Sequence, residues 1–392
     1  MDIDHVNEVA ASINAAGFSE PVLIDEADNL LNGVVRVEAA KRLGISSIPC
    51  IVAKHLTATE RRVLRLALNR LQEKGSWDFD TLKLEFEGLI LEDVSLEAAG
   101  FSSAEIDQVL LDDEAAVVEQ GPLAPEPGRE PIAKLGEIYS LGKHKIICGD
   151  ARDPSVLTAL MGEARARLIL TDEPYNVEVV GHVTRGPHRE FLMGSGEMSD
   201  PEFRCFNDDW MRSSLPYLVE GGILSTFIDW RGFPTVHAAA IGMGLSPINL
   251  VVWAKANGGM GSLYRSQHEL LPLFKKGTAP HTNNVVLGKQ GRWRSNLWTF
   301  PGASSLGSDA RGGLQHHPTV KTVALLEEAL LDISDRGDIV LDPFIGSGST
   351  LIAAEKTGRR CYGVELDPLY VDLILGRYET ITGNHAVRHA SG

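Results

Sequence analysis

The chain has 392 residues, of which 43% are hydrophobic and 23% charged, and its formal net charge is −16 at pH 7. This length is sufficient for two or three domains that each bury a core. The acidic balance excludes a wholly basic nucleic-acid-binding protein, so any contact with a polyanion has to come from a local patch. No apolar run approaches the ~20 residues of a membrane helix, and the first residues lack a signal-peptide pattern, so we expect a protein outside the membrane.

The four cysteines, Cys50, Cys148, Cys205 and Cys361, are scattered along the chain without a Cys-x-x-Cys pair. Structural zinc sites and disulfide frameworks use closely spaced or regularly spaced cysteines. We therefore expect reduced thiols, no metal site and a cytoplasmic location.

The first 56 residues alternate between helical and extended patterns, which predicts a small α/β domain over 1–56. The expected elements are helices over 6–16 and 36–43 and strands over 21–24 and 48–52. Gly33 and Arg36 flank the start of the second helix, where free N–H groups and the positive end of the helix dipole favour an anion. Arg36 can equally be an ordinary solvated helix residue, and both interpretations stay open.

Residues 57–111 form a helical segment in this interpretation. Thr57 or Thr59 can cap a helix that begins at Glu60, and further helices are expected over 79–91 and 103–111. Residues 112–131 are acidic and proline-rich with few large apolar side chains, which predicts a flexible linker.

Residues 132–392 make up the largest expected domain. Nearly continuous apolar runs alternate with helical patterns, which predicts an α/β domain with a doubly wound sheet that is covered on both faces. The expected strands are 145–148, 166–170, 223–228, 250–253 and 270–274, and the expected helices are 154–164 and 201–219.

The stretch 339–368 has the pattern of a nucleotide-binding unit. A buried strand ends at Asp342, the glycines Gly346 and Gly348 form a tight turn before a helix, and a second apolar strand ends at Glu365. The glycines allow a ligand to approach backbone N–H groups, and the acid can bind a pair of ribose hydroxyls. A nucleoside-bearing cofactor is therefore expected. The turn is not Gly-x-Gly-x-x-Gly, which disfavours an oxidoreductase.

Three further motifs point to one family. Asp172-Glu173-Pro174-Tyr175 follows an apolar strand, Phe344-Ile345-Gly346-Ser347-Gly348 forms the turn, and His317-Pro318-Thr319-Val320-Lys321 precedes the cofactor strand. This set resembles the β group of DNA amino-methyltransferases that use S-adenosylmethionine, whose Asp-Pro-Pro-Tyr motif precedes a Phe-x-Gly-x-Gly motif. The resemblance spans about residues 132–382. It implies a Rossmann-like methyltransferase sheet in permuted motif order, preceded by the small α/β domain and the helical segment.

The resemblance also implies the roles of the site residues. Asp172 and the backbone carbonyl of Glu173 would accept hydrogen bonds from the exocyclic amine of a flipped base, with Pro174 and Tyr175 completing the catalytic motif and Tyr175 stacking on the base. An Asp at the first position is typical of adenine-N6 enzymes and a Ser of cytosine-N4 enzymes, so adenine is the expected target and cytosine the lesser alternative. The residues implied to bind S-adenosylmethionine are Asp150, Thr319, Lys321, Asp342, Phe344, Gly346, Gly348 and Glu365.

Glu173 departs from the family motif, because it replaces the first proline. The backbone carbonyl survives, but the fixed φ of proline is lost and a second carboxyl group stands beside Asp172. We expect weakened activity, and the alternative is a catalytically silent DNA-binding protein.

A locally basic region is expected to contact double-stranded DNA. Residues 275–321 contain several cations and the single acid Asp309, together with Trp293 and Trp298. Such a patch suits contact with phosphates and base edges, so residues 275–316 are expected to be the target-recognition region. The implied DNA-binding residues are Lys275, Lys276, Lys289, Arg292, Arg294 and Arg311.

Residues 1–56 resemble the ParB/sulfiredoxin-like domain, with Gly33 and Arg36 in place and Val34 where that family has His. The missing His favours a role in DNA positioning or assembly over a nucleotidase or nuclease. No motif of a restriction nuclease is present in the sequence, which is typical of a solitary or phage-type methyltransferase. The oligomeric state stays open, with a homodimer as one option.

Overall fold

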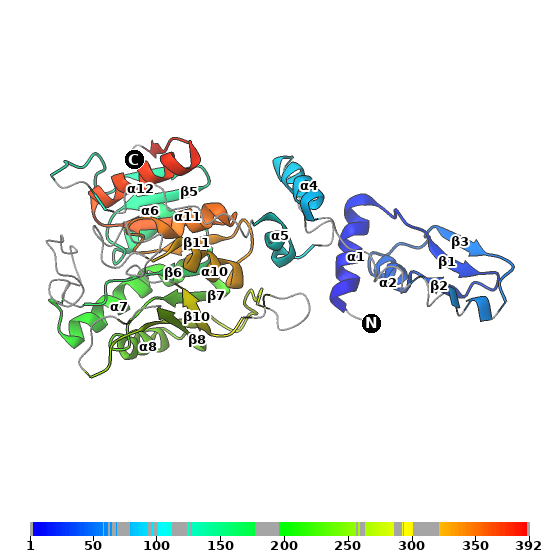
Figure 1. The fold of residues 1–392 in the computed structure, drawn as a ribbon, viewed down its shortest axis with the longest axis horizontal. Coiled ribbons are helices and arrows are strands. Elements are labelled where there is room, and N and C mark those ends of the chain that lie inside the picture. Colours follow the sequence, from blue (N-terminus) through cyan, green and yellow to red (C-terminus); the bar gives the residue numbers. More distant parts are fainter. Residues whose placement is uncertain are drawn as a thin grey trace. The chain divides into compact units, whose positions relative to one another are not determined.

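The computed structural model describes residues 3–57, 59–61, 63–64, 68, 79–92, 96, 101–111, 124–125, 128–176, 196–255, 258, 263–285, 292, 294–300 and 321–389. The chain forms two compact units, Met1–Asp112 and Asp113–Gly392, each of which is described by itself (Figure 1). In the part of the chain that is described, no helix is both long enough and apolar enough to cross a membrane.

The first unit contains a small sheet with the order β2-β1-β3. Its elements are α1 (Ile3–Ala16), β1 (Val22–Asp25), β2 (Leu30–Asn32), α2 (Val34–Arg42) and β3 (Cys50–Ala53). Strand β1 pairs with β2 antiparallel and with β3 parallel. Gly33 has φ +100°, which lets the chain turn from β2 into α2.

Two charged residues of this unit are held by neighbouring groups. The buried carboxylate of Asp25 accepts N–H groups of Asn29 and Ala27, at 2.8 and 2.9 Å. The hydrogen bond from the Asn29 backbone is the largest effect that lowers the pKa of Asp25, to about 2. Arg36 donates to Glu20 at 2.7 Å and to Asn32 at 2.9 Å. Arg36 is therefore tied to this turn and is not a freely solvated helix residue.

The helical segment contains α4 (Phe79–Leu91) and α5 (Ser103–Leu110). They share a cluster of buried side chains formed by Leu82, Phe86, Leu96, Ile106 and Val109. Ser102 caps α5, and Glu105 completes a capping box by accepting the Ser102 N–H at 2.8 Å.

The second unit is built on a ten-stranded sheet with the order β10-β8-β9-β7-β6-β11-β12-β5-β4-β13. The strands are β4 (Ile138–Leu141), β5 (His144–Cys148), β6 (Ala166–Thr171), β7 (Leu218–Thr226), β8 (Ser246–Lys255), β9 (His268–Lys275), β10 (Leu297–Phe300), β11 (Ile339–Asp342), β12 (Arg360–Glu365) and β13 (Val387–His389). Strand β11 lies between β6 and β12, so strands from the C-terminal part of the sequence occupy the centre of the sheet. This arrangement confirms the predicted permuted order.

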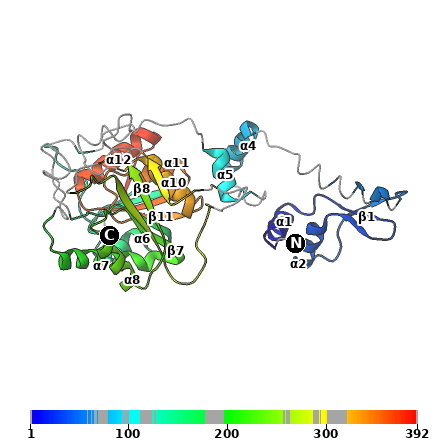
Figure 2. The same ribbon diagram turned by 60° about the horizontal axis from the view of Figure 1, so that its bottom comes forward.

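Helices cover both faces of this sheet (Figures 1 and 2). One face packs against α10 (Val323–Ile333), α11 (Ser349–Lys356) and α12 (Pro368–Thr382), and the other packs against α6 (Pro154–Met161), α7 (Asp200–Ser214) and α8 (Phe233–Gly242). Alternation along β6 explains the two cores, because Leu168 and Leu170 face the first set of helices while Ile169 faces the second.

The structure corrects two details of the predicted sheet. The helix expected over 201–219 ends at Ser214, and a 3₁₀ turn over Leu215–Tyr217 leads into β7 at Leu218. Pro216 cannot continue an α-helix in its interior, since it lacks the N–H donor. The sheet is also mixed, because β9 runs antiparallel to β7 and β8, and β4 runs antiparallel to β5 and β13.

Candidate active site

Five central strands end at one edge of the sheet, and four of them end in an acidic residue or are followed by one. Strands β5, β12, β11, β6 and β7 are mutually parallel, so their carboxyl ends lie at the same edge. Ligands of such sheets bind beyond these ends. The groups that follow the strands here are Asp150 after β5, Glu365 on β12, Asp342 on β11 and Asp172 after β6.

The glycine-rich turn connects β11 to α11. Gly346 and Gly348 have φ of +54° and +85°, a conformation that side chains disfavour. A Cβ at Gly346 would meet no atom closer than the Phe344 carbonyl oxygen at 4.0 Å, whereas one at Gly348 would lie 3.1 Å from Ile374 of α12. Gly346 therefore leaves open space in front of the turn, and Gly348 allows α11 and α12 to pack closely.

Of the two acids beside this turn, Asp342 is buried and Glu365 is half-buried, and loss of hydration governs their ionisation. Burial raises the pKa of Glu365 to about 8, although N–H groups of Asp367 and Gly346 donate to its carboxylate at 2.8 and 3.0 Å. Burial likewise raises the pKa of Asp342 to about 6. Asp342 also accepts the Thr171 hydroxyl at 2.6 Å, which fixes the end of β6 to the end of β11.

Asp150 and Phe344 face other groups of the protein. Arg152 donates to both carboxylate oxygens of Asp150, with its Nη2 at 2.7 Å from Oδ2. Burial opposes ionisation of Asp150, but these hydrogen bonds prevail and lower its pKa. The Phe344 ring packs against Phe206 and Trp210, with centroids 5.6 and 5.8 Å apart.

Asp172 lies in a compact cluster of charged and aromatic side chains. The Lys321 ammonium donates to Asp172 Oδ1 and Oδ2, each at 2.7 Å, and lies 3.1 Å from Glu269 Oε2. The Tyr175 hydroxyl donates to Asp172 at 2.8 Å and lies 3.1 Å from Glu269. Lys255 pairs with the other carboxylate oxygen of Glu269.

These contacts set the charges of the cluster. Burial raises the pKa of Asp172, and Lys321 acts against this rise. Burial alone would lower the pKa of Lys321, but the carboxylates of Asp172 and Glu269 prevail and raise it. Burial would also raise the pKa of Glu269, yet Lys321 and Lys255 lower it to about 2.

The motif implied a place at the cofactor for Lys321, which stays a prediction. In the structure its side chain is directed to the Asp172 carboxylate, which would hold the target amine. Its ammonium lies 5.3, 5.2 and 5.9 Å from the ring centroids of Tyr175, Phe227 and Trp253. These rings favour a desolvated cation at this point.

Glu173 and Pro174 complete the motif at the end of β6. Glu173 is only 1% exposed, and both of its carboxylate oxygens lack a hydrogen-bond partner among the described residues. Burial raises the pKa of Glu173 well above its usual value, and the neighbouring charge of Asp172 adds to this effect. A neutral carboxylic acid is therefore favoured beside the Asp172 carboxylate.

Four of the predicted DNA-contacting cations, Lys275, Lys276, Arg292 and Arg294, belong to the described residues, and the structure does not bring these four to this edge. Because β9 is antiparallel to β7 and β8, Lys275 at the end of β9 lies opposite Ile223 of β7 and opposite Ser246, the first residue of β8, and so lies away from the carboxyl edge that Asp172 follows. The Lys276 ammonium donates to the carbonyls of Leu215 and Leu218 at 2.8 and 2.7 Å.

Arg292 and Arg294 are also engaged inside the protein, since both pair with Glu328 and Asp332 of α10. The charges of Arg292 and Arg294 are thus directed to α10, and their expected contact with DNA stays a prediction. Thr319, Lys289 and Arg311 lie outside the described residues.

The sequence assigned no individual role to Lys255, Phe227 and Trp253. Glu269 and Trp253 are direct partners across the β8–β9 ladder, so their position follows from strand pairing that the sequence did not reveal. An apolar strand that ends in Lys255, followed by a strand whose second residue is Glu269, was the available signal.

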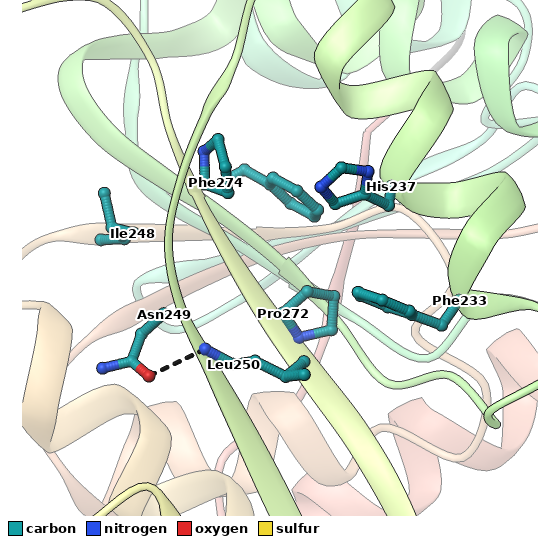
Figure 3. A pocket seen from close by; sticks show the side chains of 8 residues that line it. Phe233, His237, Ile248, Asn249, Leu250, Pro272 and Phe274 are labelled. Atoms are coloured by element: carbon teal, nitrogen blue, oxygen red, sulfur yellow. Dashed lines mark hydrogen bonds between the residues drawn. The ribbon is translucent and has the colours of Figure 1, made fainter.

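A separate pocket of about 310 Å³ lies on the α8 side of the sheet (Figure 3). The rings of Phe233, His237 and Phe274 converge there, with centroids 5.7 and 5.8 Å apart. His237 is the one ionisable side chain among the eight residues that line it. In the portion of the chain that is described, no group of His, Cys, Asp and Glu side chains is arranged to hold a metal ion.

Known proteins are similar to this chain in two regions. Residues 1–69 match the ParB N-terminal domain family. The type II methyltransferase M2.DpnII of Streptococcus pneumoniae is 29% identical over 182 residues, which are 44% of this chain and 66% of that protein. The type II methyltransferase M.HpaI of Haemophilus parainfluenzae is 23% identical over 252 residues, 60% of this chain and 74% of that protein.

A solved structure of a putative DNA modification methylase from Thermus thermophilus, complexed with S-adenosyl-L-methionine, is 24% identical with a TM-score of 0.46 and covers 62% of this chain and 96% of that one. Residues 166–376 match the family described as DNA methylase, which groups N6 and N4 enzymes. Since this match covers more than half of the chain, the protein belongs to the N6/N4 DNA methylase family.

Proposed function

We propose that this protein transfers a methyl group from S-adenosylmethionine to the exocyclic amine of a base in double-stranded DNA, with N6 of adenine as the target. The observation that carries the proposal is the hydrogen bond between Thr171 and Asp342 at 2.6 Å. This bond joins the strand that bears Asp172 to the strand that bears the glycine-rich turn. The amine acceptor and the cofactor turn are thereby neighbours at one edge of the sheet.

The residues around the turn fit S-adenosylmethionine. Gly346 has open space where a side chain would stand, so a ligand can approach its backbone. Glu365 ends β12 beside this space and can accept hydrogen bonds from a pair of ribose hydroxyls. When bound, the cofactor supplies an electrophilic methyl group on a sulfonium. The protein contributes the acceptors and the position.

Asp172 and Tyr175 suit the amine half of the reaction. The lone pair of an exocyclic amine is delocalised into the ring, which makes the amine a poor nucleophile. Acceptors for its N–H groups, here the Asp172 carboxylate and the backbone carbonyl of Glu173, localise that lone pair. The hydroxyl of Tyr175 is fixed between Asp172 and Glu269, which orients the ring for stacking on a flipped base.

The choice of adenine rests on Asp172 as the first residue of the motif. Single-molecule sequencing of plasmid DNA from cells that express the protein tests both the base and the recognised sequence. The proposal predicts N6-methyladenine at one short motif. Methylation of cytosine at N4 would overturn the choice of adenine, and unmodified DNA would overturn the activity.

Glu173 is proposed to weaken this activity, because it lacks the fixed φ of the usual proline. Glu173→Pro should therefore raise kcat for methyl transfer by about tenfold, which corresponds to ~1.4 kcal/mol of better preorganisation. Both proteins are compared with tritiated S-adenosylmethionine and the same plasmid. Equal rates would contradict the proposal. An inactive natural protein with an active variant would instead identify it as a silent homologue.

We further propose that duplex DNA meets the carboxyl edge of the sheet. Trp230, which is 54% exposed, follows β7 at this edge, and Tyr264, which is 84% exposed, lies in the connection from β8 to β9 at the same edge. Arg231 lies over the Trp230 ring, with its guanidinium carbon 5.3 Å from the ring centroid. Exposed aromatic rings beside a base-accepting site can stack on unpaired bases.

The N-terminal part is proposed to position DNA or to support assembly. The proposed boundaries are 1–56 for the ParB-like domain, 57–111 for the helical segment, 112–131 for the linker and 132–392 for the methyltransferase domain. Limited proteolysis should cut within 112–131 and release a stable fragment that begins near residue 132. A first cut inside 132–392 would contradict these boundaries. Size-exclusion chromatography of the full chain tests the homodimer.

A further inference from the structure

The Lys321 ammonium is surrounded by more hydrogen-bond acceptors than it has protons to donate. Its three ammonium protons face both oxygens of Asp172 at 2.7 Å, Glu269 Oε2 at 3.1 Å and the Tyr175 hydroxyl oxygen at 3.1 Å. The residue is only 5% exposed, so little water can take over these hydrogen bonds. The ammonium is thus shared between the carboxylate of Asp172, which follows β6, and that of Glu269 on β9.

Asp172 cannot serve Lys321 and a target amine equally well. An exocyclic amine would approach the same carboxylate with the same kind of N–H donor. The amine also gains positive charge as it is methylated, and an ammonium at hydrogen-bond distance from Asp172 opposes that charge. Productive binding therefore requires that Lys321 release Asp172.

Glu269 offers Lys321 a second position within the cluster. It already contacts the ammonium, and the charges of Lys321 and Lys255 keep the pKa of Glu269 low, so it stays ionised. The rings of Tyr175, Phe227 and Trp253 surround the ammonium, so a small displacement toward Glu269 keeps the cation within the same aromatic cage.

We propose that Lys321 is a positioning residue that competes with the target amine for Asp172 and that Glu269 receives the Lys321 ammonium when the base binds. The inference rests on the proposed function, since it concerns the amine that Asp172 would hold. It assigns to Glu269 the task of keeping Asp172 available, without contact to the base.

The test is a double-mutant cycle on the KM for a duplex that contains the sequence methylated by the wild-type protein. Glu269→Gln leaves Lys321 without its second position, so KM for DNA should rise about tenfold with a smaller change in kcat. Lys321→Gln removes the competitor and should lower KM below the wild-type value. In the double variant the rise caused by Glu269→Gln should vanish. Lys356→Gln is the matched control, because it breaks a lysine–glutamate pair with Glu327 at 2.7 Å between α11 and α10.

Lys321→Arg keeps the charge, and its guanidinium can bind Asp172 through two parallel hydrogen bonds. It should raise KM for DNA while the Kd for S-adenosylmethionine stays at the wild-type value. An unchanged KM in Lys321→Arg would overturn the proposal, and so would a rise caused by Glu269→Gln that persists in the double variant. Absence of methyl transfer by the wild-type protein would overturn the proposed function and this inference together. Transfer by the wild type with an unchanged KM in Lys321→Arg would overturn this inference alone.

Discussion

The buried carboxyl group of Glu173 allows a prediction about stability that does not depend on catalysis. Its carboxyl group is buried without a hydrogen-bond partner among the described residues, and its pKa is raised by burial. An acid with a raised pKa in the folded state binds its proton more tightly there than in the unfolded chain. The stability that this proton provides is fully present below the unfolded pKa and is lost as pH rises through the folded pKa.

Glu173→Gln replaces the carboxyl group with a neutral amide of the same shape. The variant and the natural protein should therefore have similar stability at pH 4.5. Above that pH the free energy of unfolding of the variant should rise relative to that of the natural protein by about 1.4 kcal/mol per pH unit, until the pH reaches the pKa of Glu173 in the folded state. For a unit of this size the gain corresponds to roughly 3 °C in Tm per pH unit.

Differential scanning calorimetry of both proteins between pH 4.5 and 9 measures this difference. Glu163→Gln serves as the control, because Glu163 is exposed and also lies in the second unit. A Tm difference that stays constant with pH would refute the argument, because it would mean that Glu173 titrates alike in the folded and unfolded states.

Further predictions concern the cofactor turn and the DNA-facing edge. Glu365→Gln should weaken binding of S-adenosylmethionine at pH 8.5 by tenfold or more, because a hydrogen bond to a charged group contributes about 1.5–3 kcal/mol. In the natural protein this affinity should rise with pH up to about 8, the raised pKa of Glu365, and then level off, because the ionised carboxylate is the better acceptor. Calorimetric titrations check both statements, and a flat pH profile would contradict them. Trp230→Ala should raise KM for DNA about fivefold or more, because stacking of a base on an aromatic ring contributes about 1–3 kcal/mol. Lys276→Ala should leave KM unchanged and lower Tm, because its ammonium holds the carbonyls of Leu215 and Leu218. A higher KM for DNA with an unchanged Tm would instead indicate that Lys276 contacts DNA.

The sequence predicted those parts of the fold that depend on local pattern. The strand, glycine-rich turn and helix from Ile339 to Lys356 were expected, because apolar runs and glycines with positive φ leave a strong local signal. The start of α12 is of the same local kind, because the Asp367 side chain accepts the Leu369 N–H at 3.0 Å directly beside Pro368. Such features are set by residues only a few positions apart.

What the sequence did not predict depends on contacts between distant residues. Lys321 and Asp172 are 149 positions apart, and their ion pair follows from the order of strands in the sheet. The pairing of Arg292 and Arg294 with α10 is of the same kind, since a locally basic run gives no information about acids on another element. Helix α8 was also not anticipated, because its small residues between Phe233 and Gly242 give little periodic signal.

The central claim is that Asp172 activates an exocyclic amine for methylation. Mass spectrometry of nucleosides from plasmid DNA tests it directly, with cells that express either the natural protein or Asp172→Ala. We expect N6-methyladenine with the natural protein and none with the variant. Equal amounts of methylated adenine from both proteins, or none from a natural protein that binds S-adenosylmethionine, would contradict it.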